Sequence, residues 1–257
     1  MKTLTKYLNE KLIIFPSQVD EKLVIFPSQV DEKLVIFPSQ VDEKLVINKD
    51  YKDASNYTCA PKTFEELRKV IEDKYNKFGP GTKQKPIDFN DVDVSNIDSF
   101  YDEDNDKGIF EDTKFKYIDI SDWDVSNVKN MSHAFWNCNN LVSVGNLSNW
   151  NVSNVEDMKR MFCICKQLKS VGDLSNWDVS NVKNMDRMFF YCEKIKSVGD
   201  LSKWNVSKVE CMNSMFYSCE KLISIGDLSD WNVSNVKDMN YIFGNSGITN
   251  IPGWYKK

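Results

Sequence analysis

Apolar residues recur along most of the chain with a period of 27 residues, and tryptophan marks this period most clearly. The tryptophans that open successive copies are Trp123, Trp150, Trp177, Trp204 and Trp231. Within one copy the apolar residues lie three or four places apart: Val155, Met158, Met161, Phe162, Cys165 and Leu168. This spacing is typical of one face of a helix, and a serine such as Ser153 precedes each run as an N-cap residue would. Each copy is therefore expected to contain a helix.

A shorter apolar segment follows each expected helix. In one copy it runs from Leu168 to Leu174, with Val171 at its centre and Gly172 next to it, which predicts a short strand and a turn. Neither segment could bury its apolar side alone, and a fixed period of this size is typical of stacked repeats. We therefore expect residues 87–257 to form an α/β solenoid of helix–short strand coils.

The region before the repeats, residues 50–86, carries the signals of one amphipathic helix. Thr63 and Glu66 form a capping box, and Gly79-Pro80-Gly81 marks the end of the helix. The apolar residues at helical spacing are Leu67, Val70, Ile71 and Tyr75. We expect this helix to act as an N-terminal cap on the open end of the stack.

Residues 1–49 contain a second repeat with a period of 11. Its copies are 11–21, 22–32 and 33–43, and each joins a β-prone run to a proline and a polar tail. Such copies could form an extendable array of strands. Alternatively, they are the product of a recent duplication and have weak or no structure. We expect a poorly ordered leader.

Composition narrows the classes of function. The chain has 257 residues, 41% of them hydrophobic, and a net charge of −5, which argues against nucleic-acid binding. No run of 18 apolar residues predicts a membrane-spanning helix, and the first residues do not resemble a signal peptide. Seven cysteines are an odd number and do not indicate a disulfide framework.

The repeat also resembles a known family. The stretch L-K-S-V-G-D-L-S-N-W-D-V-S-N-V-K-N-M-D-R-M-F-F-Y-C, residues 168–192, is similar to the BspA-type leucine-rich-repeat surface proteins of bacteria. The resemblance covers Val92 to about Trp254 and implies a right-handed, leucine-rich-repeat-like stack that binds ligands, often in adhesion at a cell surface. The chain lacks the signal peptide, lipobox cysteine and wall anchor of that family, so a cell-surface, cytoplasmic or virion-associated location all remain open.

Three groups of residues are candidates for metal binding or catalysis. The cysteines at one repeat position, Cys138, Cys165, Cys192 and Cys219, are expected to be buried thiols rather than metal ligands. The aspartates Asp102, Asp104 and Asp106 resemble the start of an EF-hand loop, but the glycine comes one place late, so calcium is the alternative to a solvated acidic loop. His133 has dissimilar counterparts in the other copies, which predicts an exposed, non-catalytic residue.

Two rows of residues are candidates for binding a partner. The first follows the core phenylalanine and contains Trp136, Phe190 and Tyr217, since aromatic residues supply much of the energy at interfaces; the alternative is packing between adjacent coils. The second contains Asn146, Asp173, Asp200 and Asp227, for which the alternative is turn capping. A third row, with Lys129, Glu156, Lys183, Glu210 and Lys237, is interpreted as a structural ladder of opposite charges.

These observations favour a non-catalytic protein-interaction or adhesion module that needs no cofactor and binds a protein or a cell-surface ligand. The first alternative is a phage-encoded or intracellular scaffold, because Met1–Glu10 is similar to short leaders of tailed-phage proteins. A hydrolase is the third, with little to support it, because the chain has one histidine and no Gly-rich phosphate loop.

Overall fold

The computed structural model describes residues 12–14, 34–36 and 57–256, and the chain divides into two units, Met1–Thr58 and Cys59–Lys257. In the first unit β1 (Leu12–Ile14) pairs in parallel with β2 (Leu34–Ile36). Leu12 lies opposite Leu34, so the same position of the first and third 11-residue copies is paired. The remainder of these copies lies outside the described residues.

The second unit begins with the helix expected from the capping box, and this prediction is confirmed. Helix α1 spans Phe64–Phe78, and the Thr63 hydroxyl accepts the backbone N–H of Glu66 at 3.2 Å. Gly79 ends the helix with a positive φ of 72°, which glycine adopts without strain. Leu67 and Ile71 are fully buried, so the apolar face of α1 belongs to the core of the unit.

The expected α/β solenoid, a leucine-rich-repeat-like stack of helix–short strand coils, is wrong. Within the described residues α1 is the only helix, and no strand is longer than three residues. The strands of the second unit are β3 (Ile87–Asp88), β4 (Tyr101–Asp102), β5 (Lys107–Gly108) and β6 (Ile118–Asp119). β3 pairs in parallel with β6, and β4 pairs with β5 as an antiparallel hairpin. Turns and segments without regular secondary structure make up most of the unit.

The segments expected to be helices are chains of turns, because their backbone donors bond to the next copy of the repeat. The N–H of Arg160 donates to the carbonyl of Asp186 at 2.8 Å, and the N–H of Phe162 donates to Met188 at 2.8 Å. A helix would instead direct these donors to carbonyls four residues earlier. Arg160 and Ile164 have φ values of 55° and 62°, a left-handed conformation that also interrupts a helix.

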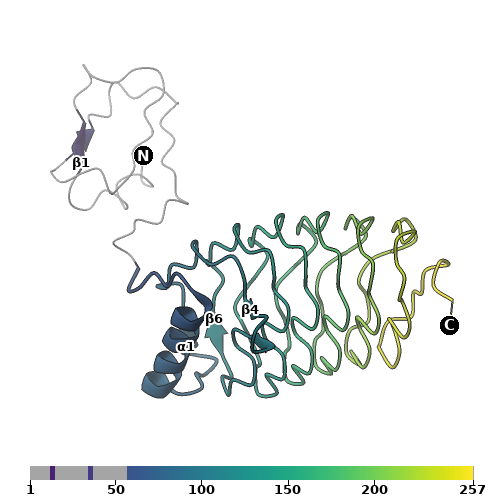
Figure 1. Cartoon of the computed structure of the whole chain (residues 1–257), viewed down its shortest axis with the longest axis horizontal. Coiled ribbons are helices and arrows are strands. Elements are labelled where there is room, and N and C mark those ends of the chain that lie inside the picture. The colour runs from purple at the N-terminus through teal and green to yellow at the C-terminus, as the bar shows by residue number, and fades with distance from the viewer. Residues whose placement is uncertain (1–11, 15–33, 37–56, 257) are drawn as a thin grey trace. The chain divides into compact units, whose positions relative to one another are not determined.

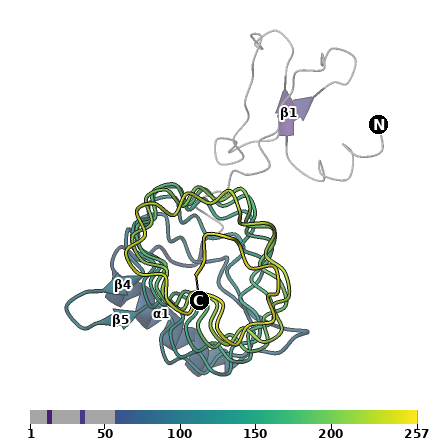
Figure 2. The ribbon, with the colours of Figure 1, turned by 90° about the vertical axis from the view of Figure 1, so that its right-hand side faces the viewer.

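Each stretch from one repeat tryptophan to the next is called a repeat segment here. Successive repeat segments lie side by side, and viewed at right angles their traces nearly superimpose (Figures 1 and 2). Isolated parallel bridges join residues at the same position, as in Asn130–Asp157–Asn184. The 27-residue period therefore arranges equivalent residues in rows, whose backbone contacts are turns and single bridges.

Aromatic rows fill the core of the second unit. The rings of Phe135 and Phe162 stack with centroids 5.0 Å apart and planes 7° from parallel. Trp150 and Trp177 stack at 6.4 Å, and both are buried. At the C-terminal end Trp254 stacks on Trp231 at 6.2 Å.

Among the described residues no helix has the length and apolar character needed to cross a membrane.

Candidate functional site

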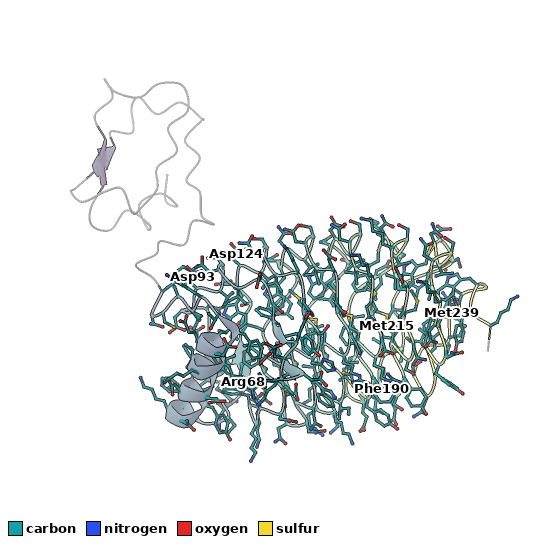
Figure 3. All side chains as sticks on the ribbon, in the orientation of Figure 1. Arg68, Asp93, Asp124, Phe190, Met215 and Met239 are labelled. Carbon is teal, nitrogen blue, oxygen red and sulfur yellow. The ribbon has the colours of Figure 1, made fainter. Side chains whose placement is uncertain are left out.

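The residue after each core phenylalanine points away from the core. Phe189 is fully buried and Phe190 is half-buried. The two side chains thus point in different directions, although this segment is not helical. The N–H of Phe190 closes a turn with the carbonyl of Arg187 at 3.1 Å, and this turn directs the two neighbouring rings to opposite sides of the backbone. Phe190 lies near the margin of the second unit, as Figure 3 shows.

Phe190, Tyr191 and Tyr217 form a continuous group of rings, called the aromatic patch here. Phe190 and Tyr217 stack with centroids 5.3 Å apart, and Tyr191 lies 4.6 Å from Phe190 and 5.8 Å from Tyr217. All three side chains are half-exposed. Gly244 occupies the next place in the row, and a Cβ there would lie 2.6 Å from the ring of Tyr217, so the absence of a side chain makes room for this ring.

Trp136, the third aromatic residue predicted for this row, is not part of the patch. Cys163 takes the place between Trp136 and Phe190, and its side chain is buried. Trp136 instead lies against His133, with ring centroids 5.3 Å apart, and beneath the guanidinium of Arg160 at 6.0 Å. The structure thus brings Phe190 and Tyr217 together and leaves Trp136 in a separate cluster.

Two cationic side chains border the aromatic patch. The guanidinium of Arg187 lies 5.9 Å from the ring centre of Phe190, and the ammonium of Lys166 lies 5.9 Å from that of Tyr191. Arg187 also pairs with the carboxylate of Asp186 at 2.9 Å, which fixes the guanidinium beside the ring. Sequence analysis missed Tyr191 and both cations, although Tyr191 is adjacent to Phe190 in the sequence.

His133 is buried, and the prediction that it is exposed is wrong. The β4–β5 hairpin, which has no counterpart in the other repeat segments, covers it, and the ring of Tyr101 stacks on the imidazole at 5.2 Å. The hairpin packs closely, because a Cβ on Gly108 would lie 1.9 Å from the carbonyl oxygen of His133. Burial, followed by the charge of Arg160, lowers the pKa of His133 to about 4.

The three aspartates proposed as a calcium alternative lie on the β4–β5 hairpin and bond within it. Asp102 accepts the backbone N–H groups of Asp104 and Asn105 at 3.0 and 3.2 Å. Asp106 accepts the phenol of Tyr101 at 2.6 Å, and this hydrogen bond raises the pKa of Tyr101 to about 12. Across the described residues no three His, Cys, Asp or Glu side chains are grouped so that they could hold a metal ion.

The repeat is matched by a family model described as "Mycoplasma protein of unknown function, DUF285", over residues 104–222 and again over 139–254. The two matches together cover more than half of the chain. The protein belongs to the DUF285 family. The matches overlap by several repeat segments, as expected when one model is placed on a periodic sequence in two registers. No curated protein and no solved structure matches the chain.

The acidic row of this DUF285 protein closes turns. Asp173, Asp200 and Asp227 each accept the backbone N–H of the serine two residues later, at 2.9 to 3.0 Å. Asn146 makes the same contact with Ser148 at 3.1 Å. Hydrogen bonds from the neighbouring serines lower the pKa of Asp200 and Asp227. The geometry is that of turn capping, and a role for these exposed carboxylates in binding stays a prediction.

The cysteine row of the DUF285 repeat consists of buried, free thiols, as predicted. Each thiol lies within hydrogen-bond distance of the carbonyl of a core phenylalanine in the preceding repeat segment. Cys165 contacts Phe135 at 3.0 Å, and Cys192 contacts Phe162 at 3.1 Å. Burial raises the pKa of both thiols well above the usual range, so they stay protonated and are poor nucleophiles at neutral pH.

Proposed function

We propose that this DUF285 protein is a non-catalytic binding module that holds a protein partner through the aromatic patch. The observation that carries the proposal is the contact of three half-exposed rings, Phe190, Tyr191 and Tyr217, on one surface. Large aromatic side chains supply much of the binding energy at protein interfaces, where they lose little conformational entropy.

The backbone beneath the patch supports this function because it is already ordered. The N–H of Tyr191 donates to the carbonyl of Tyr217 at 2.8 Å, and the N–H of Phe189 donates to Met215 at 2.9 Å. A surface held in this way loses less conformational entropy on association than a loop does. Arg187 and Lys166 border the patch, and each pairs with a carboxylate of the protein, Asp186 at 2.9 Å and Glu193 at 3.9 Å, so the edge is a polar rim around an apolar centre.

A role in adhesion is our further proposal, and its support is the similarity of the repeat to BspA-type surface proteins. An intracellular or phage-encoded scaffold would use the same patch and would differ in location. The proposal gives the protein no catalytic role, because His133 is buried with a pKa of about 4 and the thiols of the cysteine row stay protonated.

A comparative capture experiment tests the proposal. Immobilised wild-type protein and the double variant Phe190→Ser, Tyr217→Ser are offered the same extract of cell-surface proteins. The matched control is Phe78→Ser, Ile223→Ser, which removes two exposed apolar side chains (51% and 71% exposed) outside the patch. We expect one protein to be retained by the wild type and the control and to be lost by the patch variant. Equal retention by all three would overturn the assignment of the patch.

A further inference from the structure

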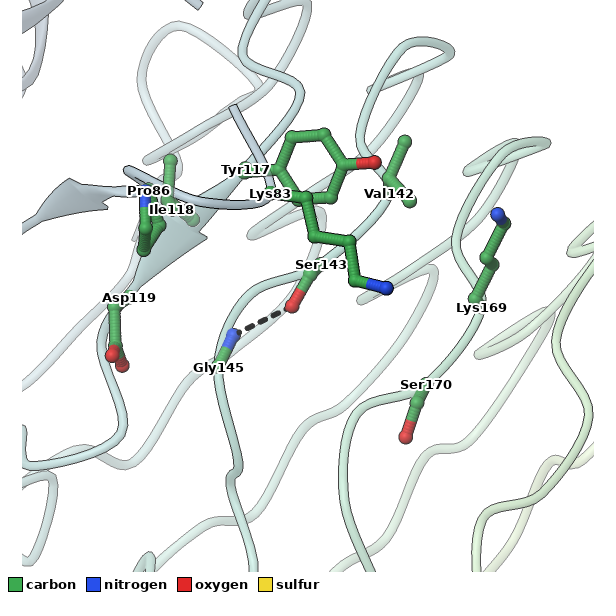
Figure 4. A pocket seen from close by; sticks show the side chains of 10 residues that line it. All are labelled: Lys83, Pro86, Tyr117, Ile118, Asp119, Val142, Ser143, Gly145, Lys169 and Ser170. Carbon is green, nitrogen blue, oxygen red and sulfur yellow. Dashed lines mark hydrogen bonds between the residues drawn. The ribbon is translucent and has the colours of Figure 1, made fainter. Parts of the chain in front are cut away.

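A second surface of the protein is distinct from the aromatic patch, because it is a pocket lined by lysine side chains. A pocket of about 320 Å³ lies beside β6, where the region before the repeats meets the first repeat segments (Figure 4). Tyr117 and Val142 provide apolar wall, and Ser143 and Ser170 provide hydroxyl groups. Lys83 and Lys169 are the two cations that line it.

The backbone fixes the parts of this pocket relative to one another. Parallel bridges join Tyr117 to Ser143 and Ser143 to Ser170, which places three successive segments side by side. Lys83 is held on a tight turn, in which Thr82 and Lys85 exchange backbone hydrogen bonds of 3.0 and 3.2 Å. In Figure 4 the Lys83 side chain extends toward the side of the pocket where Lys169 lies.

The positive charge of the pocket is only partly balanced by its own lining, which holds two lysines and one aspartate. The side-chain ammonium groups of Lys83 and Lys169 have no ion-pair or hydrogen-bond partner within the described residues, and both side chains are exposed. The single acidic residue of the lining, Asp119, already accepts the N–H and the hydroxyl of Ser121 at 3.0 and 2.6 Å. Unpaired cations in a chain with a net charge of −5 attract a ligand that is itself anionic.

The lysines of the alternating-charge row behave differently. Lys183 pairs with Glu156 and Lys237 pairs with Glu210, each at 2.6 Å, as the sequence predicted for a structural ladder. Lysines in two parts of the same unit thus have different environments: paired in the alternating row and unpaired at the pocket.

The basic character continues beyond the pocket along one row. The N–H of Lys196 donates to the carbonyl of Lys169 at 3.2 Å, and the N–H of Val142 donates to that of Lys116 at 2.7 Å. The N–H of Lys169 in turn donates to the carbonyl of Val142 at 3.1 Å, so this position is occupied in successive segments by Lys116, Val142, Lys169 and Lys196. The hydroxyls of Ser143 and Ser170 each accept a backbone N–H, from Gly145 and Gly172, and keep their own hydrogen for donation. The row therefore offers repeated hydrogen-bond donors to an extended ligand.

We infer that this pocket and the lysine row bind an acidic polysaccharide. The pocket has the size of a sugar ring with its substituents, and the apolar face of Tyr117 with Val142 suits the C–H face of a pyranose. Sulfate or carboxylate groups would pair with Lys83 and Lys169, and sugar hydroxyls would accept from the serines. The repeat of the lysine row allows later residues of the polymer to meet Lys196.

The test measures binding of the full chain to heparin, hyaluronate and neutral dextran. We expect binding to an acidic polysaccharide and none to dextran, and the ranking of heparin and hyaluronate tells whether sulfate or carboxylate is preferred. Lys83→Gln with Lys169→Gln should weaken affinity about tenfold or more, because two charge-assisted contacts are lost. The matched control, Lys183→Gln with Lys237→Gln, removes the same charge from the alternating row and should change affinity less than about twofold.

A second variant separates sugar recognition from simple charge attraction. Tyr117→Ser removes the apolar wall and keeps every lysine, so it should weaken heparin binding and leave binding of inorganic polyphosphate unchanged. Thermal unfolding of each variant confirms that it is folded. Equal losses in the two lysine variants, an unaffected Lys83/Lys169 variant, or tighter binding of DNA of the same length than of either acidic polysaccharide would each overturn the inference.

Discussion

The indole N–H of Trp177 donates a hydrogen bond to the backbone carbonyl of Leu147, thirty residues earlier, at 2.9 Å. Trp204 makes the same contact with Leu174, also at 2.9 Å. The tryptophan side chain therefore fills the core and also donates a hydrogen bond to a carbonyl of an earlier repeat segment. A segment of this kind has no helix to satisfy its own backbone, and such contacts between segments stabilise it.

Truncation of Trp177 should therefore destabilise the protein strongly. We expect Trp177→Ala to lower the free energy of unfolding by about 3–5 kcal/mol, as is usual for a buried aromatic residue. Trp177→Phe keeps most of the packing and removes one donor, while the Leu147 carbonyl still accepts the backbone N–H of Trp150 at 3.1 Å, so it should cost only about 0.5–1.5 kcal/mol. Denaturant unfolding measures both. An unfolding midpoint that hardly moves for Trp177→Ala would show that the tryptophan row is not part of the core.

His133 should make the stability of the protein depend on pH. Its pKa is lowered to about 4 in the folded state, so between pH 6.5 and 4 the unfolded state binds the extra proton. The contribution of His133 to stability should fall as the pH is lowered through this window, by up to about 3 kcal/mol, and this contribution should level off below it. The charged groups that act on the imidazole are Arg160 and Lys159, which lower its pKa, and Asp106, which raises it.

The control for this prediction is His133→Asn, because asparagine tolerates the positive φ of 56° at this position. The difference in unfolding free energy between wild type and variant should change with pH between 6.5 and 4 and stay constant at higher pH. A difference that is the same at pH 7 and pH 4.5 would contradict the burial of His133 beneath the β4–β5 hairpin.

The buried thiols should be protected from chemical modification. Cys192 is fully buried and the pKa of its thiol is raised, whereas Cys59 and Cys211 are partly exposed. We expect alkylation of the native protein to label Cys59 and Cys211 and to reach Cys192 after unfolding, as peptide mass spectrometry would show.

EDTA and thiol reductants should leave the melting temperature unchanged. A shift of several degrees with either reagent would contradict the account of the cysteine row or of the acidic loop.

Deletion of residues 15–47 should leave the second unit intact. The deletion joins Ile14 to Asn48, and no apolar pattern in the removed stretch matches the 27-residue repeat. Calorimetry should show the same cooperative transition as in the full chain. Aggregation or a broadened transition would show that the 11-residue copies cover part of the repeat array.

The sequence predicted the repeating positions correctly, and it also predicted helix α1, its N-cap residue Thr63 and its end at Gly79. It did not predict the backbone of the repeat, because a spacing of three and four residues fits both a helix and a chain of turns. The deciding contacts, such as that between Arg160 and Asp186, join residues 26 positions apart. Local propensity contains no information about such contacts. The left-handed conformation of Arg160 and Ile164 was equally hidden, because neither residue type favours it.

The candidate site was predicted in part. Phe190 and Tyr217 share a repeat position, and stacking of the segments brings them into contact. Tyr191 lies one residue after Phe190, and the turn brings its ring against that of Phe190. A comparison of equivalent repeat positions does not reveal this contact, because Tyr191 belongs to a different position. His133 was misjudged for a related reason, since comparison of equivalent positions does not reveal cover from the β4–β5 hairpin, which occurs in one copy.

Binding of a protein partner through the aromatic patch is tested by measuring stability and affinity on the same sample of the double variant Phe190→Ser, Tyr217→Ser. Both rings are half-buried and lie outside the core, so we expect a thermal unfolding midpoint close to that of the wild type. We also expect a loss of at least about 2 kcal/mol in affinity for the captured partner, as for an interface hot spot. A clear loss of stability with unchanged affinity of the folded fraction would contradict the account, because the rings would then serve packing between repeat segments.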